Sequence, residues 1–202
     1  MNMFSGENLI HLIQTVSYFG IFGIVFAESG LFFGFFLPGD SLLFTAGLLA
    51  SQGHLNILLL LIITFVAAVL GDNVGYAFGA KMGPKIFKKK DSLFFKKENI
   101  TRAEKFYEQY GPSTIILARF IPIVRTFAPI VAGVGKMKYQ TFLLYNLIGG
   151  FAWTVLLTMA GYSLSKIYPG IGENLELAVI IIVILSIMPA IYHVLKEKRA
   201  AR

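Results

Sequence analysis

The sequence predicts an all-α membrane protein, an inverted repeat with two opposed re-entrant helical hairpins, three full transmembrane helices and amphipathic interfacial helices. Three observations support this fold class. The 202 residues are 56% hydrophobic and only 14% charged, too few polar residues to cover a soluble domain. Two apolar runs are interrupted by proline. Nine of the 18 basic residues fall within 81–105, between apolar runs, and none precedes Lys81.

The N-terminal part predicts a short amphipathic helix, a hairpin and a span. Apolar side chains recur at helical spacing over 8–18, which favours a helix lying in the membrane interface. Two apolar arms then flank Pro38-Gly39, and the second is too short to cross a bilayer. We therefore expect a re-entrant hairpin over about 19–52, followed by a full span over 55–80.

The C-terminal part repeats this order. The apolar run 112–134 is broken by Pro122 and Pro129, which predicts a second re-entrant hairpin. Two further apolar runs are long enough to cross the membrane. We expect one membrane domain, with a first repeat over 8–80, a basic cytoplasmic segment over 81–110, a second repeat over 112–164 that ends in the span 139–164, and a C-terminal span over 175–195.

The basic residues predict an orientation, because Lys and Arg beside membrane spans stay in the cytoplasm. The segment 81–105, the pair Lys136 and Lys138, and the C-terminus are then all cytoplasmic. The first hairpin enters from the outside and the second from the cytoplasm. In inverted repeats of this kind, discontinuous helices meet near the midplane and form the substrate site.

The formal net charge of +7 is located beside the membrane. We expect anionic lipid headgroups at the basic segment and no nucleic acid, since no stacking platform accompanies the charge. A solvated loop that only sets the topology explains the segment equally well. With no cysteine, and three histidines far apart in the sequence, we expect no metal site and no cofactor.

Five ionisable residues lie within apolar segments, where charges are costly and usually functional: Glu28, Asp40, Asp72, Arg119 and Arg125. Two planar guanidinium groups suit a phosphate, so the arginines are candidates for binding a lipid phosphate. A carboxyl group in apolar surroundings favours its neutral form, so Glu28 and Asp40 are candidates for proton coupling or gating. The alternative is a buried ion pair that only holds the two hairpins together.

Asp72 is harder to interpret. It follows Gly71, the first of four glycines at every fourth position: Gly71, Gly75, Gly79 and Gly83. Such a row lets another helix approach closely, and helix packing alone explains it. Asp72 either supports the site or simply hydrogen-bonds to a hairpin turn.

Three segments together resemble the DedA family, membrane proteins that share the VTT or SNARE-associated domain. They are Glu28 to Asp40, with Phe36-Leu37-Pro38-Gly39-Asp40 at its end; Gly71-Asp72-Asn73-Val74-Gly75-Tyr76 with Gly79; and Arg119-Phe120-Ile121-Pro122 with Arg125 and Ala132-Gly133. The match covers roughly residues 15–165, and the motifs follow one another in the family's order.

This resemblance implies a small lipid transporter of the bacterial inner membrane. Its substrate would be undecaprenyl phosphate or another phosphate-bearing lipid, and eukaryotic relatives are linked to phospholipid scrambling. Glu28 and Asp40 match the family's essential acidic residues, and Arg119 and Arg125 match its essential basic pair. The supporting residues would be Asp72, Pro38, Gly39, Pro122, Gly71, Gly75 and Tyr76.

The same residues are compatible with two other functions. A proton-coupled small-solute or cation antiporter would use Glu28 and Asp40 as its transport groups. A polyprenyl pyrophosphate phosphatase would need a nucleophile and a proton donor beside the arginines. Ser29 and Ser41 have no histidine nearby in the sequence, so we do not expect an enzyme. The oligomeric state stays open.

Overall fold

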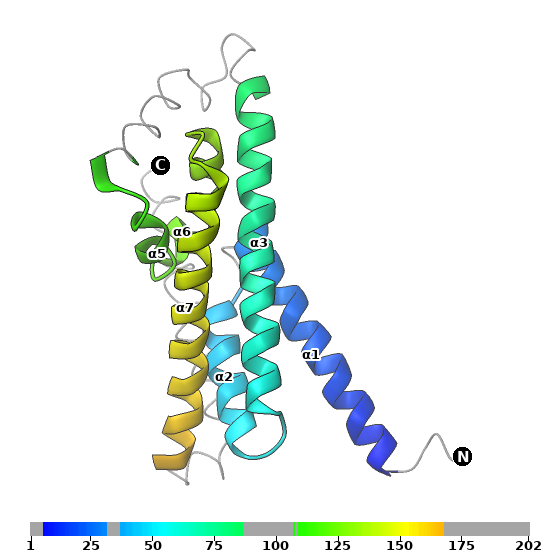
Figure 1. The fold of residues 1–202 in the computed structure, drawn as a ribbon. Coiled ribbons are helices and arrows are strands. Elements are labelled where there is room, and N and C mark those ends of the chain that lie inside the picture. The colour runs from blue at the N-terminus through cyan, green and yellow to red at the C-terminus, as the bar shows by residue number, and fades with distance from the viewer. Residues whose placement is uncertain (1–5, 32–36, 87–106, 108, 168–202) are drawn as a thin grey trace, which may run out of the picture. The chain divides into compact units, whose positions relative to one another are not determined.

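The computed structural model describes residues 6–31, 37–86, 107 and 109–167, and every element in these ranges is a helix (Figure 1). The predicted all-α class is confirmed. The helices are α1 (Gly6–Gly30), α2 (Gly39–Ser51), α3 (Ile57–Ile86), α5 (Thr114–Ala118), α6 (Pro122–Val134) and α7 (Tyr139–Ile167). The predicted C-terminal span over 175–195 and most of the basic segment lie outside the described residues.

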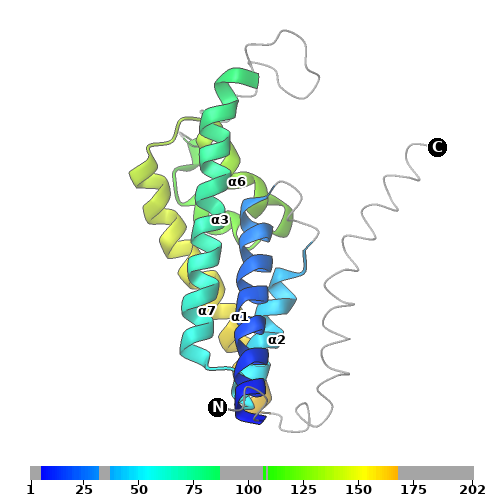
Figure 2. The same cartoon turned by 90° about the vertical axis from the view of Figure 1, so that its right-hand side faces the viewer.

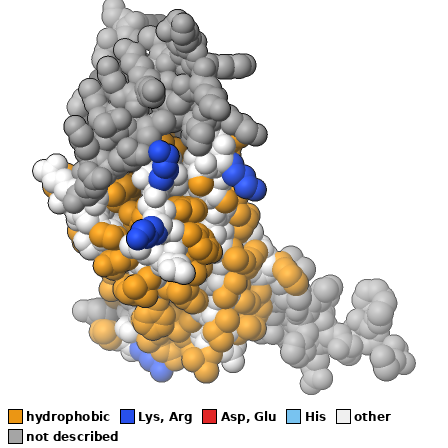
Figure 3. Space-filling model, turned by 45° about the horizontal axis from the view of Figure 1, so that its top comes forward, with side chains coloured by type: hydrophobic (Ala, Val, Ile, Leu, Met, Phe, Trp, Pro, Cys, Tyr) orange, Lys and Arg blue, Asp and Glu red, His pale blue; other side chains and the backbone are white. Residues whose placement is uncertain are grey.

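Two helices, α3 over Ile57–Met82 and α7, are long and apolar enough to cross a membrane. They coincide with the predicted spans 55–80 and 139–164. Along its length α3 exposes an apolar side chain at every fourth position: Leu58, Ile62, Val66, Leu70, Val74, Phe78 and Met82. Figure 3 shows a face of the molecule on which hydrophobic side chains cover most of the described surface. Surfaces of this kind suit lipid and not water.

The N-terminal helix differs from its prediction. Instead of an interfacial helix followed by a separate hairpin arm, α1 is continuous over 25 residues, about 37 Å. Gly20 and Gly23 do not interrupt it, because a helix satisfies its own backbone hydrogen bonds, and this is decisive in hydrocarbon. The following helix is short, as expected: α2 has 13 residues, about 20 Å, and Pro38 is its N-cap residue.

The second apolar run breaks where Pro122 predicts it. Ile121 is extended, with φ −116° and ψ 108°, as a residue before proline prefers. Pro122 then occupies the first turn of α6, where a missing N–H costs nothing. The prediction of a second break at Pro129 is wrong, because α6 continues through it to Val134. An isolated proline removes a single donor, which apolar helices tolerate.

The chain forms two compact units. Unit 1 consists of Met1–Ile24, Phe36–Thr64 and Thr154–Arg202, and unit 2 of Val25–Phe35 and Phe65–Trp153. In unit 1, α2 lies against the C-terminal part of α7 (Figures 1 and 2). A Cβ atom at Gly47 or Gly161 would collide with the backbone of the other helix, so glycine permits this contact.

In unit 2, the glycine row of α3 receives two neighbours. Gly71 packs on the C-terminal turn of α1, where a Cβ atom would lie 2.7 Å from the Phe26 carbonyl oxygen. Gly79 packs on α6, where a Cβ atom would meet the Ile130 carbonyl. Close backbone approach therefore brings the ends of α1 and α6 to the same side of α3.

Candidate functional site

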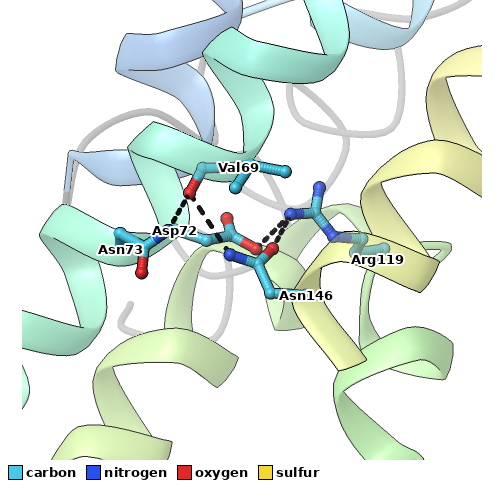
Figure 4. Close-up of polar contacts among 5 residues, drawn as sticks. All are labelled: Val69, Asp72, Asn73, Arg119 and Asn146. Carbon is cyan, nitrogen blue, oxygen red and sulfur yellow. Dashed lines mark hydrogen bonds and ion pairs between the residues drawn. The ribbon is translucent and has the colours of Figure 1, made fainter. Parts of the chain in front are cut away.

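Arg119 lies at the break between α5 and α6, as the C-cap residue of α5. Its side chain is buried and extends toward two other helices (Figure 4). One terminal nitrogen, Nη2, donates hydrogen bonds both to Oδ2 of Asp72 on α3 and to Oδ1 of Asn146 on α7. A single guanidinium nitrogen thus joins an ionisable and a non-ionisable partner.

The surroundings hold this arrangement in place. Asn146 donates from Nδ2 to the Val69 carbonyl of α3 at 3.2 Å, and Asn73 donates to the same carbonyl at 2.8 Å (Figure 4). On α7, two glycines leave room for the arginine: a Cβ atom at Gly149 would lie 3.0 Å from Arg119 Cδ, and one at Gly150 would lie 3.5 Å from Arg119 Nη2.

Arg125, in the first half of α6, forms the second buried ion pair of unit 2. Its Nη2 donates to Oε1 of Glu28, near the C-terminal end of α1. Its guanidinium carbon lies 4.9 Å from the centre of the Trp153 ring, close enough for a cation–π interaction. Glu28 is 1% exposed and Trp153 is 2% exposed, so bulk water does not screen this pair.

The two arginines and their carboxylates are all nearly inaccessible. Desolvating charges is costly, and a buried pair is tolerated only when each ion keeps its partner. Removing one partner alone leaves an uncompensated charge, at a cost of about 3–5 kcal/mol. The two pairs are therefore stable only as pairs, or with another anion in place of the carboxylate.

Two tyrosine hydroxyl groups form hydrogen bonds to backbone carbonyls within unit 2. The Tyr76 hydroxyl donates to the Met137 carbonyl, and its ring stacks on Phe142 with centroids 4.5 Å apart. The Tyr107 hydroxyl donates to the Ala128 carbonyl of α6 at 2.9 Å. Burial raises the pKa of Tyr107 above its ordinary value, so this hydroxyl stays protonated and remains a donor.

The structure brings four of the five predicted charges into unit 2. Glu28 pairs with Arg125 and Asp72 pairs with Arg119. Asp72, whose role the sequence left open, is the carboxylate partner of Arg119. Asp40 lies in the first turn of α2 and belongs to unit 1, as do Pro38 and Gly39.

The sequence analysis did not single out Asn146, the glycine pair after it, or Trp153. Asn146 is 0% exposed although it is an amide in the middle of an apolar span. Gly149 and Gly150 follow it by three and four residues, which places all three on one helix face. A polar residue in that position was a usable signal.

The site offers guanidinium and carboxylate groups, which suit an anion and a proton. Among the described residues, no three His, Asp or Glu side chains gather in a way that could hold a metal ion. Unit 1 contains a cavity of about 520 Å³ between α1 and α2, lined by Ile21, Leu42, Leu49 and other mainly apolar side chains. Among the described residues its lining includes His54 but no Lys or Arg, so it lacks the guanidinium or ammonium groups that suit a phosphate.

Comparison with known proteins identifies relatives along nearly the whole chain. The VTT domain family model matches residues 37–163. The chain is 44% identical over 200 residues to Protein DedA of Escherichia coli strain K12, covering 95% of this chain and 91% of that protein.

Two further relatives are named as membrane proteins. An uncharacterized membrane protein of Mycobacterium tuberculosis is 46% identical over 185 residues, 91% of this chain and 81% of that protein. The inner membrane protein YqjA of Escherichia coli is 34% identical over 149 residues, 74% of this chain and 68% of that protein. No solved structure matches the chain.

Proposed function

Because the chain belongs to the DedA family of VTT-domain membrane proteins, we propose that it moves a phosphate-bearing lipid between the two leaflets of the bacterial inner membrane. Undecaprenyl phosphate is the substrate that the family resemblance favours, and a phospholipid is the other. The single observation that carries the proposal is the pair of buried arginines beside the break between α5 and α6, each held by one carboxylate from another helix.

A buried guanidinium paired with a carboxylate can exchange that carboxylate for phosphate. Both anions accept hydrogen bonds from the planar guanidinium, and phosphate offers more acceptor oxygens. Protonation of the carboxylate removes the competitor without leaving a buried negative charge. In this proposal Arg119 and Arg125 bind the lipid phosphate, and Glu28 and Asp40 couple or gate transport by exchanging protons.

We also propose that the two hairpins enter the membrane from opposite faces, the first from outside and the second from the cytoplasm. The short helices α2 and α6 support the hairpins, because each has 13 residues, about 20 Å, and the hydrocarbon core is about 30 Å thick. The basic residues support the orientation. The basic segment and the C-terminus are then cytoplasmic, with anionic headgroups beside them.

The test is a leaflet-accessibility assay in proteoliposomes with a fluorescent polyprenyl phosphate. Wild-type protein should move the lipid to the opposite leaflet, and Arg119→Ala and Arg125→Ala should abolish movement. Because each of these variants removes the ion-pair partner of a buried carboxylate, its insertion and monodispersity must be checked first. Lys138→Ala, at an exposed position, is the matched loss of a positive charge and should keep wild-type transport.

Two results would point to another function. Phosphate release during the assay would indicate a phosphatase. Proton flux that depends on a small solute or cation, with no lipid movement, would indicate an antiporter. Lipid movement that persists in both Arg variants would refute the assigned phosphate site.

A further inference from the structure

From the contacts of Arg119 we propose that Asp72 is the exchangeable partner of this arginine and Asn146 its permanent one. Protonation of Asp72 then releases the guanidinium to a phosphate-type anion while Asn146 keeps it in position. This inference rests on the proposed function, because it assigns how the phosphate site is opened. It gives positioning roles to two residues beside Arg119.

The first step is geometric. Asp72 Oδ2 and Asn146 Oδ1 accept from the same Arg119 nitrogen, but they come from different helices and differ in chemistry (Figure 4). A carboxylate takes up a proton and then loses its attraction for a guanidinium. An amide does not titrate in the physiological range, so its hydrogen bond to Arg119 is independent of pH.

The second step concerns what holds Asn146. Its other side-chain atom, Nδ2, donates to the Val69 carbonyl of α3, so both ends of the amide are used within the described structure. Gly149 and Gly150, which are on the same helix as Asn146, line the side chain of Arg119. The arginine therefore keeps its path and one hydrogen bond when Asp72 is neutral.

The third step is spare donor capacity. Arg119 is 3% exposed, and its Nε has no hydrogen-bond partner among the described residues. A buried donor without a partner is costly unless a ligand or water satisfies it. An anion arriving at Arg119 gains this donor in addition to the place that Asp72 vacates.

The charged groups whose fields reach Asp72 are Arg119 and Arg125, and Arg125 is itself paired with Glu28. From α7 the facing group is Asn146, which carries no charge. Opposite charges in contact change proton affinity by roughly ten- to thousandfold. Binding is reciprocal, so protonation of Asp72 changes anion affinity by the same factor. Anion binding should therefore strengthen as the pH falls.

The experiment measures binding of farnesyl phosphate to the full-length detergent-solubilised protein at pH 6 and pH 8. Trp153, the single tryptophan, lies beside Arg125 and supplies a fluorescence signal. Farnesol controls for the hydrocarbon tail, and inorganic phosphate shows whether the headgroup alone suffices. The affinity of each variant is divided by the affinity of wild type at the same pH. The effect of the probe's own ionisation on affinity is the same in both and drops out of this ratio.

Asp72→Asn, a stand-in for the protonated state, should bind at least about tenfold more tightly than wild type at pH 8, with a much smaller difference at pH 6. Asn146→Asp adds a second carboxylate and should weaken binding at pH 8 by a similar factor. Asn73→Ala is the matched control, since Asn73 shares the Val69 carbonyl with Asn146 and adjoins Asp72 in sequence. Its affinity for farnesyl phosphate should equal that of wild type at both pH values.

If Asp72→Asn does not fold, the exchange variant Asp72→Asn/Asn146→Asp keeps one carboxylate at the same nitrogen. It should retain binding that weakens as the pH rises. The inference is overturned if wild type binds the probe but Asp72→Asn has the same affinity ratio at both pH values, or if a folded exchange variant has a flat pH profile. Absence of binding by wild type at pH 6, equal to Arg119→Ala, would instead refute the proposed function itself.

Discussion

Arg119 and Arg125 are both buried guanidinium groups, but their neighbours are different in kind. Arg119 shares one nitrogen between a carboxylate and an amide, whereas Arg125 meets a carboxylate and lies over an indole ring. The guanidinium carbon of Arg125 lies 4.9 Å from the centre of the Trp153 ring, whereas at Arg119 a single nitrogen, Nη2, serves both acceptors and Nε has no partner among the described residues. Lysine carries its charge on a single nitrogen, so at either position it lacks the second donor nitrogen that a planar guanidinium offers to a phosphate.

We therefore expect Arg119→Lys and Arg125→Lys to insert normally but to transport at least about tenfold more slowly than wild type, because a point charge cannot replace a planar donor group on phosphate. The proteoliposome assay measures this directly. Lys138→Arg, at an exposed site, is the control for an exchange of basic residues. Full activity in both arginine variants would exclude bidentate phosphate capture.

A second residue-scale prediction concerns protons. If Glu28 and Asp40 exchange protons during transport, the charge-neutral variants Glu28→Gln and Asp40→Asn should still bind farnesyl phosphate but show a weaker pH dependence of net transport than wild type, because the contribution of Asp72 remains. Rates at pH 6, 7 and 8 in proteoliposomes measure the effect. A variant with wild-type rates and an unchanged pH profile would show that its carboxylate is structural.

At the scale of elements, small residues decide which helices can touch. The glycines of α3 admit α6 and the end of α1, and Gly133 of α6 faces the backbone of α3 near Tyr76 and Ala80. Glu28 and Arg125 lie on these same two neighbours, α1 and α6. The glycine row thus determines how closely α1 and α6, which carry Glu28 and Arg125, approach α3.

We expect Gly79→Ala to lower the thermal stability of the solubilised protein and to impair transport. A Cβ atom there would collide with the Ile130 backbone, and overpacking costs about 1–3 kcal/mol. Gly23→Ala is the matched control, because a Cβ atom at Gly23 meets nothing within 4 Å. That change should be neutral or stabilising, by about 0.5–1 kcal/mol. Equal melting temperatures for the two variants would contradict the packing argument.

At the scale of the whole molecule, the membrane governs the arrangement of the chain. Among the described helices, α3 and α7 are long and apolar enough to cross, α1 at about 37 Å has the length to cross, and α2 and α6 are too short. The basic residues, concentrated in 81–105 and near the ends of apolar runs, then specify which ends face the cytoplasm. Orientation is therefore a property of the complete chain and not of any one helix.

The absence of cysteine makes this orientation directly testable. In intact cells, a membrane-impermeant maleimide should label His54→Cys, in the exposed connection before α3, but not Lys138→Cys, at the exposed position just before α7. Permeabilised cells should label both, which controls for reactivity. Labelling of Lys138→Cys in intact cells would reverse or refute the proposed topology.

The sequence by itself determined the helical membrane class, the two described spans, the break at Pro122 and the identity of the charges inside apolar segments. These features follow from local causes: hydropathy, helix length, and the geometry of proline and the residue before it. Where two local signals competed, the prediction was wrong. The predicted boundary between 8–18 and the hairpin from about 19 is absent from α1, and Pro129 does not end α6, because a helix satisfies its own backbone hydrogen bonds in hydrocarbon.

Only the tertiary structure decided which charges are partners. Arg119 meets Asp72 across 47 positions of sequence and Asn146 across 27. Arg125 meets Glu28 across 97 positions. Such contacts depend on which helix faces pack together, and in α3 and α7 glycines set those faces where a side chain would obstruct them. Local sequence shows that a buried charge needs a partner, but the partner is chosen by the packing of distant helices.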